Sequence, residues 1–124
     1  MQQIRPEGGP QAGGAYVPGI RAGDFVFVSG QGPNDPQTGE LAEDLEGQVR
    51  ATLGNVERVL AAAGASLHDV VRVDAYLADL GTFDEYDRVF REVFAGHLPT
   101  RTTVEAGLAG IRVEINAIAF VGGK

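Results

Sequence analysis

The chain has 124 residues, 44% of them hydrophobic and 22% charged, which is the balance of an ordinary globular protein and predicts a single domain over residues 1–124. It contains no cysteine, so disulfides, cysteine-ligated metal centres and thiol nucleophiles are excluded. Seventeen acidic and ten basic residues give a net charge of −7, which argues against a nucleic-acid partner, because such binding depends on clustered cations.

The first residues show no targeting pattern. The stretch from Pro6 to Gly14 is rich in glycine and proline and lacks the apolar region of a signal peptide, so it predicts a loop. No apolar run in the sequence approaches the roughly 18 residues that a membrane span requires. Together these features favour a cytoplasmic protein with no membrane partner.

The first half of the chain predicts a strand, a loop and a helix. Residues 25–29 are an aromatic and β-branched run closed by Gly30, which predicts a strand buried on both faces. Residues 34–39 are dense in turn-forming residues and predict a loop. Between residues 45 and 63 apolar side chains recur at three- and four-residue steps, which predicts an amphipathic helix, and Gly64 is placed to end it.

The second half predicts three strands and another helix. Residues 70–77 alternate as a strand does, with the odd-numbered residues on the apolar face. Residues 82–85 have the spacing of a capping box and open a second helix. Residues 102–106 and 111–121 predict two further strands. Strands divided around two helices indicate an α+β domain, in which the helices cover one face of the sheet.

The last predicted strand carries an unusual outer face. Glu114 is polar, but further along the same face Ile118 and Phe120 are apolar. A face exposed to water seldom carries two such large apolar side chains together. Because the two helices can cover only one face, we expect the other face to be buried between subunits of an oligomer.

Two residues are candidates for chemistry. Arg101 stands where a loop enters a strand; it is either a surface cation or a fork that clamps a small carboxylate. Glu114 lies on the expected interface, where a carboxylate is costly unless it is paired or used, and Arg101 is its natural partner. An arginine for a substrate carboxylate and a glutamate to orient water suit a hydrolytic site. His68 and His97 match no metal-ligand spacing, so no metal site is expected.

Six short motifs, in their order and spacing, resemble the RidA family, also called the YjgF family. The motifs are Gly14-Ala15-Tyr16, Phe27-Val28-Ser29-Gly30-Gln31, Asp35-Pro36-Gln37-Thr38-Gly39-Glu40, Ala63-Gly64-Ala65-Ser66-Leu67-His68-Asp69-Val70-Val71, Pro99-Thr100-Arg101-Thr102 and Val113-Glu114-Ile115.

The resemblance implies a fold, an assembly and an activity. The fold would be α+β and chorismate-mutase-like, a mixed β-sheet with two helices packed on one face. The assembly would be a homotrimer with its sites between subunits. The activity would be hydrolysis of short 2-imino acids or their enamine tautomers, such as 2-iminobutanoate and the 2-iminopropanoate that arises from 2-aminoacrylate. The products would be 2-oxo acids and ammonia, with neither a cofactor nor a metal required.

The resemblance also implies the roles of individual residues. Arg101 would bind the substrate carboxylate, and Glu114 would position and polarise the attacking water, so these two are the expected catalytic residues. Tyr16 and Ser29 would line the substrate-binding pocket. Gly30 would let the backbone approach the substrate closely.

The chain departs from the family pattern at positions that bear on substrate range. The departures are Ala15 and Val17 beside the tyrosine, Thr100 and Thr102 beside the arginine, and Asp87, which stands where the family often has asparagine. Two alternatives therefore stay open. One is deamination of a larger enamine such as 2-aminomuconate, and the other is a non-enzymatic module that binds small carboxylates or protects proteins.

Overall fold

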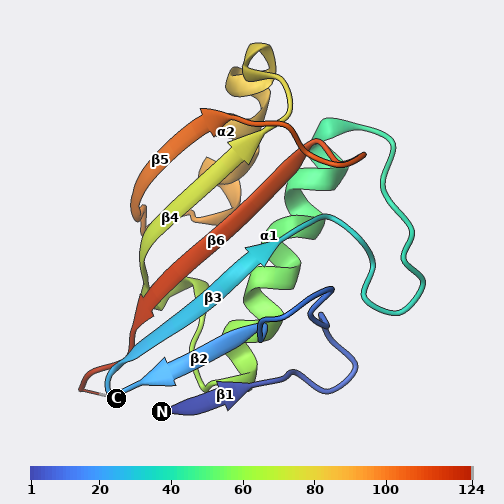
Figure 1. Ribbon diagram of the computed structural model, residues 1–124. Helices are drawn as coiled ribbons and strands as arrows, with labels where there is room; N and C mark the ends of the chain where they lie inside the picture. The colour runs from blue at the N-terminus through green and yellow to red at the C-terminus, as the bar shows by residue number, and fades with distance from the viewer. Residues whose placement is uncertain (124) are drawn as a thin grey trace.

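The computed structural model describes residues 1–123, which form one mixed sheet of six strands in the order β1-β2-β3-β6-β4-β5, together with two α-helices (Figure 1). Neighbouring strands are antiparallel, except that β4 and β5 run parallel. Among these residues no helix is long and apolar enough to cross a membrane. The elements are β1 Gln2–Ile4, β2 Gly19–Ala22, β3 Phe25–Gln31, α1 Leu45–Ala62, η1 Leu67–Asp69, β4 Val70–Leu77, η2 Leu80–Thr82, α2 Phe83–Val93, β5 Thr100–Glu105 and β6 Val113–Phe120.

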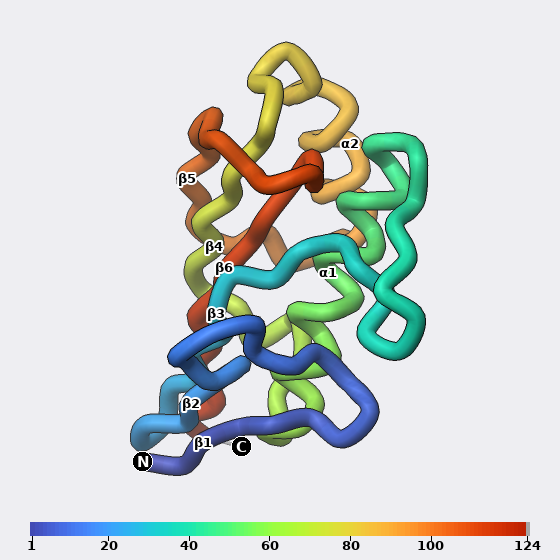
Figure 2. The backbone as a smooth tube through the Cα atoms, turned by 45° about the vertical axis from the view of Figure 1, so that its right-hand side comes forward, coloured from blue at the N-terminus to red at the C-terminus, as the bar shows by residue number. Residues whose placement is uncertain are grey.

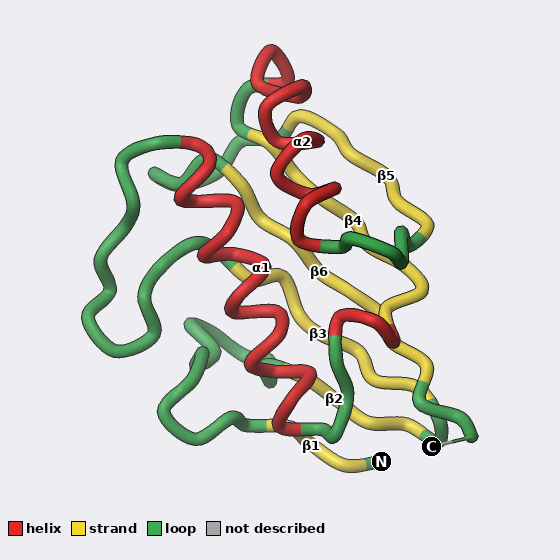
Figure 3. Tube along the Cα trace, turned by 180° about the vertical axis from the view of Figure 1, so that it is seen from behind, coloured by secondary structure: helices red, strands yellow, loops and turns green. Residues whose placement is uncertain are grey.

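Both α-helices pack on the same face of the sheet, as Figure 3 shows from behind. The core lies between them and the strands, where Leu53, Val56, Tyr86, Val73 and Ile115 are almost completely shielded from water. Removing such side chains from water is the main contribution to folding. The α+β class and the arrangement of two helices on one face are thus confirmed.

The opposite face of the sheet, turned toward the viewer in Figure 1, carries exposed aromatic side chains. Phe25, Phe27 and Phe120 are 42%, 44% and 43% exposed, and the ring centroids of Phe25 and Phe120 lie 5.3 Å apart. The expectation that residues 25–29 are buried on both faces is therefore wrong for the single chain. Alternation along β3 turns Val26 and Val28 inward and the two phenylalanines outward.

One side chain of β4 faces the other way from the expected pattern. Val71 is 42% exposed, whereas its neighbour Val70 is fully buried. The cause is an irregularity in the ladder between β4 and β6, which falls between Val70 and Arg72. A bulge adds one residue to a strand and so reverses the inward and outward sides beyond it.

The second helix begins differently from its predicted capping box. The Thr82 hydroxyl does not cap α2 but donates to the Asp79 carbonyl at 2.6 Å. The helix is preceded by the single turn η2, in which Gly81 N donates to the Asp79 side chain at 2.8 Å and Leu80 N donates to Glu105 Oε1 at 2.9 Å. The helix itself is confirmed, but the capping box is wrong.

The N-terminal segment contributes two strands, β1 and β2, whose ranges the sequence pattern did not indicate. β1 has three residues, too few to show alternation, and pairs with β2 so that Ile4 is buried. Beyond it, residues 5–18 form a loop that lies beside the loop of residues 32–44, near α1 (Figure 2). The two loops together border the end of β3.

Buried polar side chains of α1 hold the surrounding loops. Asn55 Nδ2 donates to the carbonyl groups of Gly32 and Asn34, each at 2.9 Å. Gln48 Oε1 accepts from the backbone N–H of Arg112 at 2.9 Å, just before β6. Buried polar groups are tolerated when they are hydrogen-bonded in this way. The ends of β3 and β6 are consequently fixed to the same helix.

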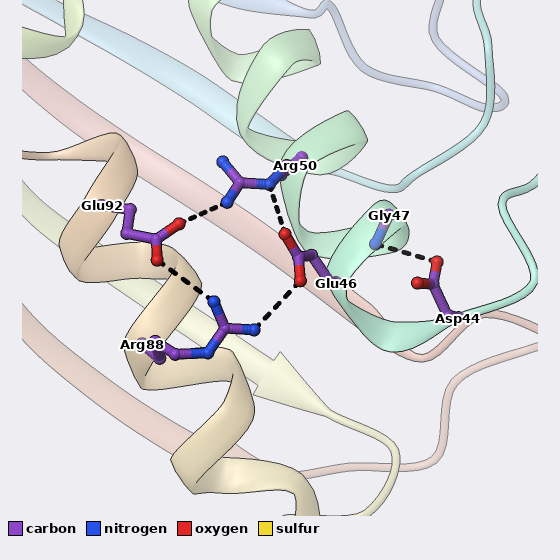
Figure 4. A network of polar contacts seen from close by, with 6 residues as sticks. All are labelled: Asp44, Glu46, Gly47, Arg50, Arg88 and Glu92. Atoms are coloured by element: carbon purple, nitrogen blue, oxygen red, sulfur yellow. Dashed lines mark hydrogen bonds and ion pairs between the residues drawn. The ribbon is translucent and has the colours of Figure 1, made fainter.

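A ring of four charged side chains joins the two helices on the surface (Figure 4). Arg88 lies 3.0 Å from Glu46 and 3.1 Å from Glu92, and Arg50 lies 3.0 Å from Glu46 and also pairs with Glu92. All four side chains are between 37% and 51% exposed. Water screens such pairs, so each of them contributes little to stability.

Candidate functional site

Gly30 and Glu114 are pressed together on the open face of the sheet. A Cβ atom at Gly30 would lie 2.6 Å from Glu114 Oε2, closer than side-chain contacts allow. The ladder between β3 and β6 is irregular between Val28 and Gln31, so Ser29 and Gly30 form a bulge opposite Asn116, two residues from the glutamate along β6. Any side chain at Gly30 would have to displace the carboxylate.

Ser29 fastens the loop that carries Tyr16 to the end of β3. Its Oγ donates to the Val17 carbonyl at 2.6 Å, and its backbone N–H donates to the Pro18 carbonyl at 2.9 Å. Tyr16 itself is 51% exposed, and its hydroxyl accepts from Gly13 N at 3.1 Å. The Ser29 hydroxyl proton is thus committed to the loop, while its oxygen lone pairs remain able to accept.

These residues surround one depression, here called the open-face hollow, with a volume of about 610 Å³. Four of the five expected site residues line it, namely Tyr16, Ser29, Gly30 and Glu114. The remaining lining residues are Phe27, Val28, Asp74, Asn116, Ala117 and Ile118. The hollow therefore combines one apolar side with a carboxylate, a hydroxyl and backbone groups, the mixture that small-molecule sites use.

Asp74 is a second carboxylate of the hollow, and sequence reasoning did not select it. Arg72 Nη2 pairs with Asp74 Oδ1 at 2.8 Å and donates to Thr102 Oγ1 at 2.9 Å. The alternation in residues 70–77 already placed Asp74 on the outer face, and that was the signal available. What the sequence lacked was the pairing of β4 with β6, which sets Asp74 opposite Asn116.

Arg101, the fifth expected residue, lies on the other side of the sheet. In the parallel pair of β4 and β5 it stands opposite Val73, which is fully buried under the helices. Paired residues of neighbouring strands point to the same face, so Arg101 faces the helices while Glu114 faces the open-face hollow. A single chain does not bring these two side chains to one small molecule.

The guanidinium of Arg101 is held by α2. Its Nη2 lies 2.8 Å from Asp87 Oδ1, so the ion-pair partner is Asp87 and not Glu114 as expected. The Cζ atom is 5.4 Å from the ring centroid of Phe83, 5.1 Å from that of Tyr86 and 4.7 Å from that of Phe90. At these distances each ring attracts the cation. Three aromatic side chains of α2 thus form a seat for the arginine.

Tyr86 completes this seat as a neutral hydrogen-bonding group. Burial raises the pKa of the Tyr86 hydroxyl above its ordinary value, and the bond to Thr103 together with nearby Arg101 opposes that rise. The hydroxyl lies 2.9 Å from Thr103 Oγ1, and either oxygen can be the donor. The tyrosine therefore stays protonated at neutral pH and links α2 to β5.

No metal centre is formed by the side chains of residues 1–123, where no group of three or more His, Asp or Glu could hold an ion. The fold does bring the two histidines together, with the ring centroids of His68 and His97 6.3 Å apart. His97 Nε2 is already hydrogen-bonded to the Val70 carbonyl at 3.1 Å.

Known proteins resemble the chain over nearly its whole length. The Endoribonuclease L-PSP family matches residues 7–121. A 2-iminobutanoate/2-iminopropanoate deaminase of Salmonella typhimurium is 37% identical over 121 residues, which is 94% of each chain, and a RutC family protein of Pyrococcus horikoshii is 40% identical over 120 residues, or 94% of this chain and 95% of its own. The crystal structure of Escherichia coli TdcF with bound serine has a TM-score of 0.91 at 36% identity, covering 97% of this chain and 98% of that one.

Proposed function

The chain belongs to the Endoribonuclease L-PSP family, the family of RidA and YjgF, and from this we propose that it is a hydrolase that deaminates short 2-imino acids. The substrates are species such as 2-iminobutanoate and 2-iminopropanoate, and the products are the 2-oxo acid and ammonia. The observation that carries the proposal is the carboxylate of Glu114 resting on Gly30 within the open-face hollow.

The reaction requires the protein mainly to bind the substrate and to orient the attacking water molecule. Arg101 holds the substrate carboxylate by its guanidinium fork. Glu114 accepts a hydrogen bond from a water molecule and directs it at the imine carbon, which is already electrophilic. The water oxygen bonds to that carbon and a proton passes to the nitrogen, giving a carbinolamine. The carbinolamine hydroxyl then gives up its proton, the nitrogen takes up a proton, and the carbon–nitrogen bond breaks, so that ammonia leaves and the carbonyl group forms.

The proposal includes a homotrimer whose sites lie between subunits. Its support is geometric: Arg101 and Glu114 face opposite sides of the sheet, and the exposed aromatic cluster of Phe25, Phe27 and Phe120 offers a surface to bury. In such an assembly the arginine of one copy meets the glutamate of the next. The reaction is placed in the cytoplasm, where pyridoxal-phosphate enzymes acting on serine and threonine release these imines.

The proposal is tested by generating 2-iminobutanoate in place with a threonine dehydratase and following its disappearance. The wild-type chain is expected to accelerate the loss of imine. The variants Arg101→Ala and Glu114→Gln are expected to reduce this acceleration by a factor on the order of 100, since each removes a group that binds or orients a reactant. Arg112→Ala, which removes an exposed arginine two residues before Glu114, serves as the matched control and should act like the wild type. Equal activity of all four proteins would refute the site.

A second candidate function is binding of small carboxylates without catalysis. It is favoured by the similar crystal structure of TdcF, which holds serine, a molecule with a carboxylate and no imine. Such a module needs Arg101 but no glutamate to aim water. An unchanged rate of imine loss, together with binding of 2-oxobutanoate that Arg101→Ala abolishes and Glu114→Gln preserves, would select this function. If the protein instead accelerated the loss of a larger enamine such as 2-aminomuconate, its substrate would be that larger enamine.

A further inference from the structure

The ion pair of Arg101 and Asp87 leaves part of the guanidinium available. Asp87 Oδ1 lies 2.8 Å from the Nη2 nitrogen of Arg101, and the other Asp87 oxygen lies 3.8 Å from Arg91 Nη2. The side chains of Arg101 and Asp87 are 20% and 30% exposed, so the pair is neither sealed from water nor fully screened by it. A guanidinium has five N–H donors, and those on the other nitrogens can still meet a second carboxylate.

The pair sits in a fixed place. The rings of Phe83, Tyr86 and Phe90 surround the Arg101 guanidinium within 5.4 Å, and all three belong to α2, as does Asp87. Because the rings already hold the cation on α2, the Asp87 charge is not needed merely to keep the arginine near the helix. The main effect of Asp87 on a bound ligand is then the electrostatic repulsion between its carboxylate and the carboxylates of the ligand.

The cation of the proposed clamp already has an acidic partner before any ligand binds. Asp87 lies 2.8 Å from Arg101 and 3.8 Å from Arg91. In the open-face hollow, Asp74 is paired with Arg72 at 2.8 Å, and Glu114 adds a further negative charge. A 2-imino acid with an uncharged side chain brings one carboxylate, balanced when its nitrogen is protonated. A substrate with an acidic side chain brings a second carboxylate toward the negative charges of Asp87 and Glu114, and these charges repel it.

We infer that Asp87 is a specificity-determining residue, which makes the arginine clamp select ligands with one carboxylate over ligands with two. This inference rests on the proposed function for the role of Arg101 as the carboxylate clamp. Asp87 acts through its charge on Arg101 and on the ligand. It takes no part in bond making or breaking.

The variant Asp87→Asn separates charge from geometry. The asparagine retains an Oδ1 acceptor for Arg101 Nη2 but carries no charge. The matched control is Asp84→Asn, which removes the same charge from an exposed position one turn earlier on α2. Asp87→Ser retains a short acceptor and serves as a second uncharged variant, and circular dichroism establishes that each variant is folded.

Dissociation constants are measured by ligand-observed NMR for 2-oxobutanoate, with one carboxylate, and 2-oxoglutarate, with two. In Asp87→Asn, binding of 2-oxoglutarate should tighten about tenfold and that of 2-oxobutanoate about threefold, because each ligand carboxylate loses one repulsion at close range. The ratio of the two constants should stay at its wild-type value in Asp84→Asn. The effect of Asp87→Asn should shrink in high salt, which a purely structural role would not explain.

Several outcomes would overturn the inference. An unchanged ratio in both Asp87 variants, an equal change in Asp84→Asn, or failure of the wild type to bind either 2-oxo acid would each do so. The test does not depend on catalysis. A wild-type chain that fails to deaminate imines but shows the Asp87-dependent ratio would refute the proposed function and support the specificity role.

Discussion

At the scale of single residues, the contact between Gly30 and Glu114 connects backbone conformation to chemistry. The bulge in β3 brings the Cα atom of Gly30 against the carboxylate, so the glutamate occupies space that any other residue would fill. Ser29, the preceding residue, binds the loop that carries Tyr16. Two neighbouring residues of β3 thus position both the Glu114 carboxylate and the loop that carries Tyr16, which line the open-face hollow.

Gly30→Ala is expected to lower kcat/KM for imine hydrolysis about 10- to 100-fold, because the new methyl group displaces the Glu114 carboxylate that aims the water. The free energy of unfolding should fall by less than about 1 kcal/mol, since the atom that must move ends a flexible side chain. Imine loss and thermal unfolding measure the two effects.

Gly54→Ala is the control for adding a methyl group. Gly54 lies inside α1, and its Cβ would be 3.5 Å from Arg58 Nη1, an ordinary contact. The change should keep full activity and raise stability by roughly 0.5–1 kcal/mol, because alanine favours the helix. Full activity of Gly30→Ala would show that the position of the Glu114 carboxylate does not matter for the reaction.

At the scale of elements, α1 and α2 are joined to each other and to the site by side chains of different kinds. Asn55 of α1 fixes the loop after β3 through buried hydrogen bonds, and Asp87 of α2 holds Arg101 of β5. The exposed ring around Glu46 links the two helices. The two helices therefore position the loop after β3 and the Arg101 side chain. The strength of the ion pairs in the ring depends on pH and salt concentration.

Glu46→Gln is expected to reduce stability at neutral pH and to have progressively less effect in acid. The bonds from Arg88 first, and then from Arg50, hold the pKa of Glu46 below its ordinary value of 4.5. A carboxylate with a lowered folded pKa stabilises the fold above its unfolded pKa, and this contribution disappears as the pH falls through the folded pKa.

Thermal unfolding midpoints of the wild type and Glu46→Gln, recorded between about pH 3 and pH 7, measure this contribution. The difference between the two unfolding midpoints should be constant near neutral pH, should disappear below pH 4.5 and should become smaller when salt is added. Glu57→Gln removes an exposed charge from the same helix without an ion pair among residues 1–123 and should show no such closing. A gap independent of pH would contradict the role given to Glu46.

At the scale of the whole molecule, the sheet separates the two residues proposed for catalysis. Glu114 lies on the open face and Arg101 on the helix face at the edge strand β5. The open face also carries the exposed cluster of Phe25, Phe27 and Phe120. An assembly that covers this cluster and brings an edge strand to it would complete the site.

Mixing two inactive variants tests this arrangement directly. Arg101→Ala and Glu114→Gln, unfolded together and refolded as a mixture, should regain activity, because some interfaces then pair an intact arginine with an intact glutamate. For random assembly into a ring, about one quarter of the sites are intact. Activity is compared with each variant refolded alone, and light scattering measures the assembly. A mixture as inactive as its components would mean that both residues act from one chain.

Much of the architecture was predictable from local patterns. The three- and four-residue apolar spacing of α1 and the alternation of β4 and β6 identify these elements, since each element buries one side of itself. Four of the residues that line the open-face hollow were also selected from the sequence, Tyr16 and Gly30 only through the resemblance to the RidA family, and Ser29 and Glu114 with its help. Short β1, the Val70–Arg72 irregularity and the start of α2 were missed, because they depend on contacts with neighbouring elements.

The sequence by itself determined which side chains alternate along β6, and thereby that Glu114 shares an outer face with Ile118 and Phe120. Only the tertiary structure decided that Arg101 belongs to the opposite face, beside Asp87. The physical reason is that alternation relates residues within one strand, whereas the common face of two strands is set by their register. That register joins residues 28 positions apart in β4 and β5 and is fixed by hydrogen bonds and packing that no local pattern contains.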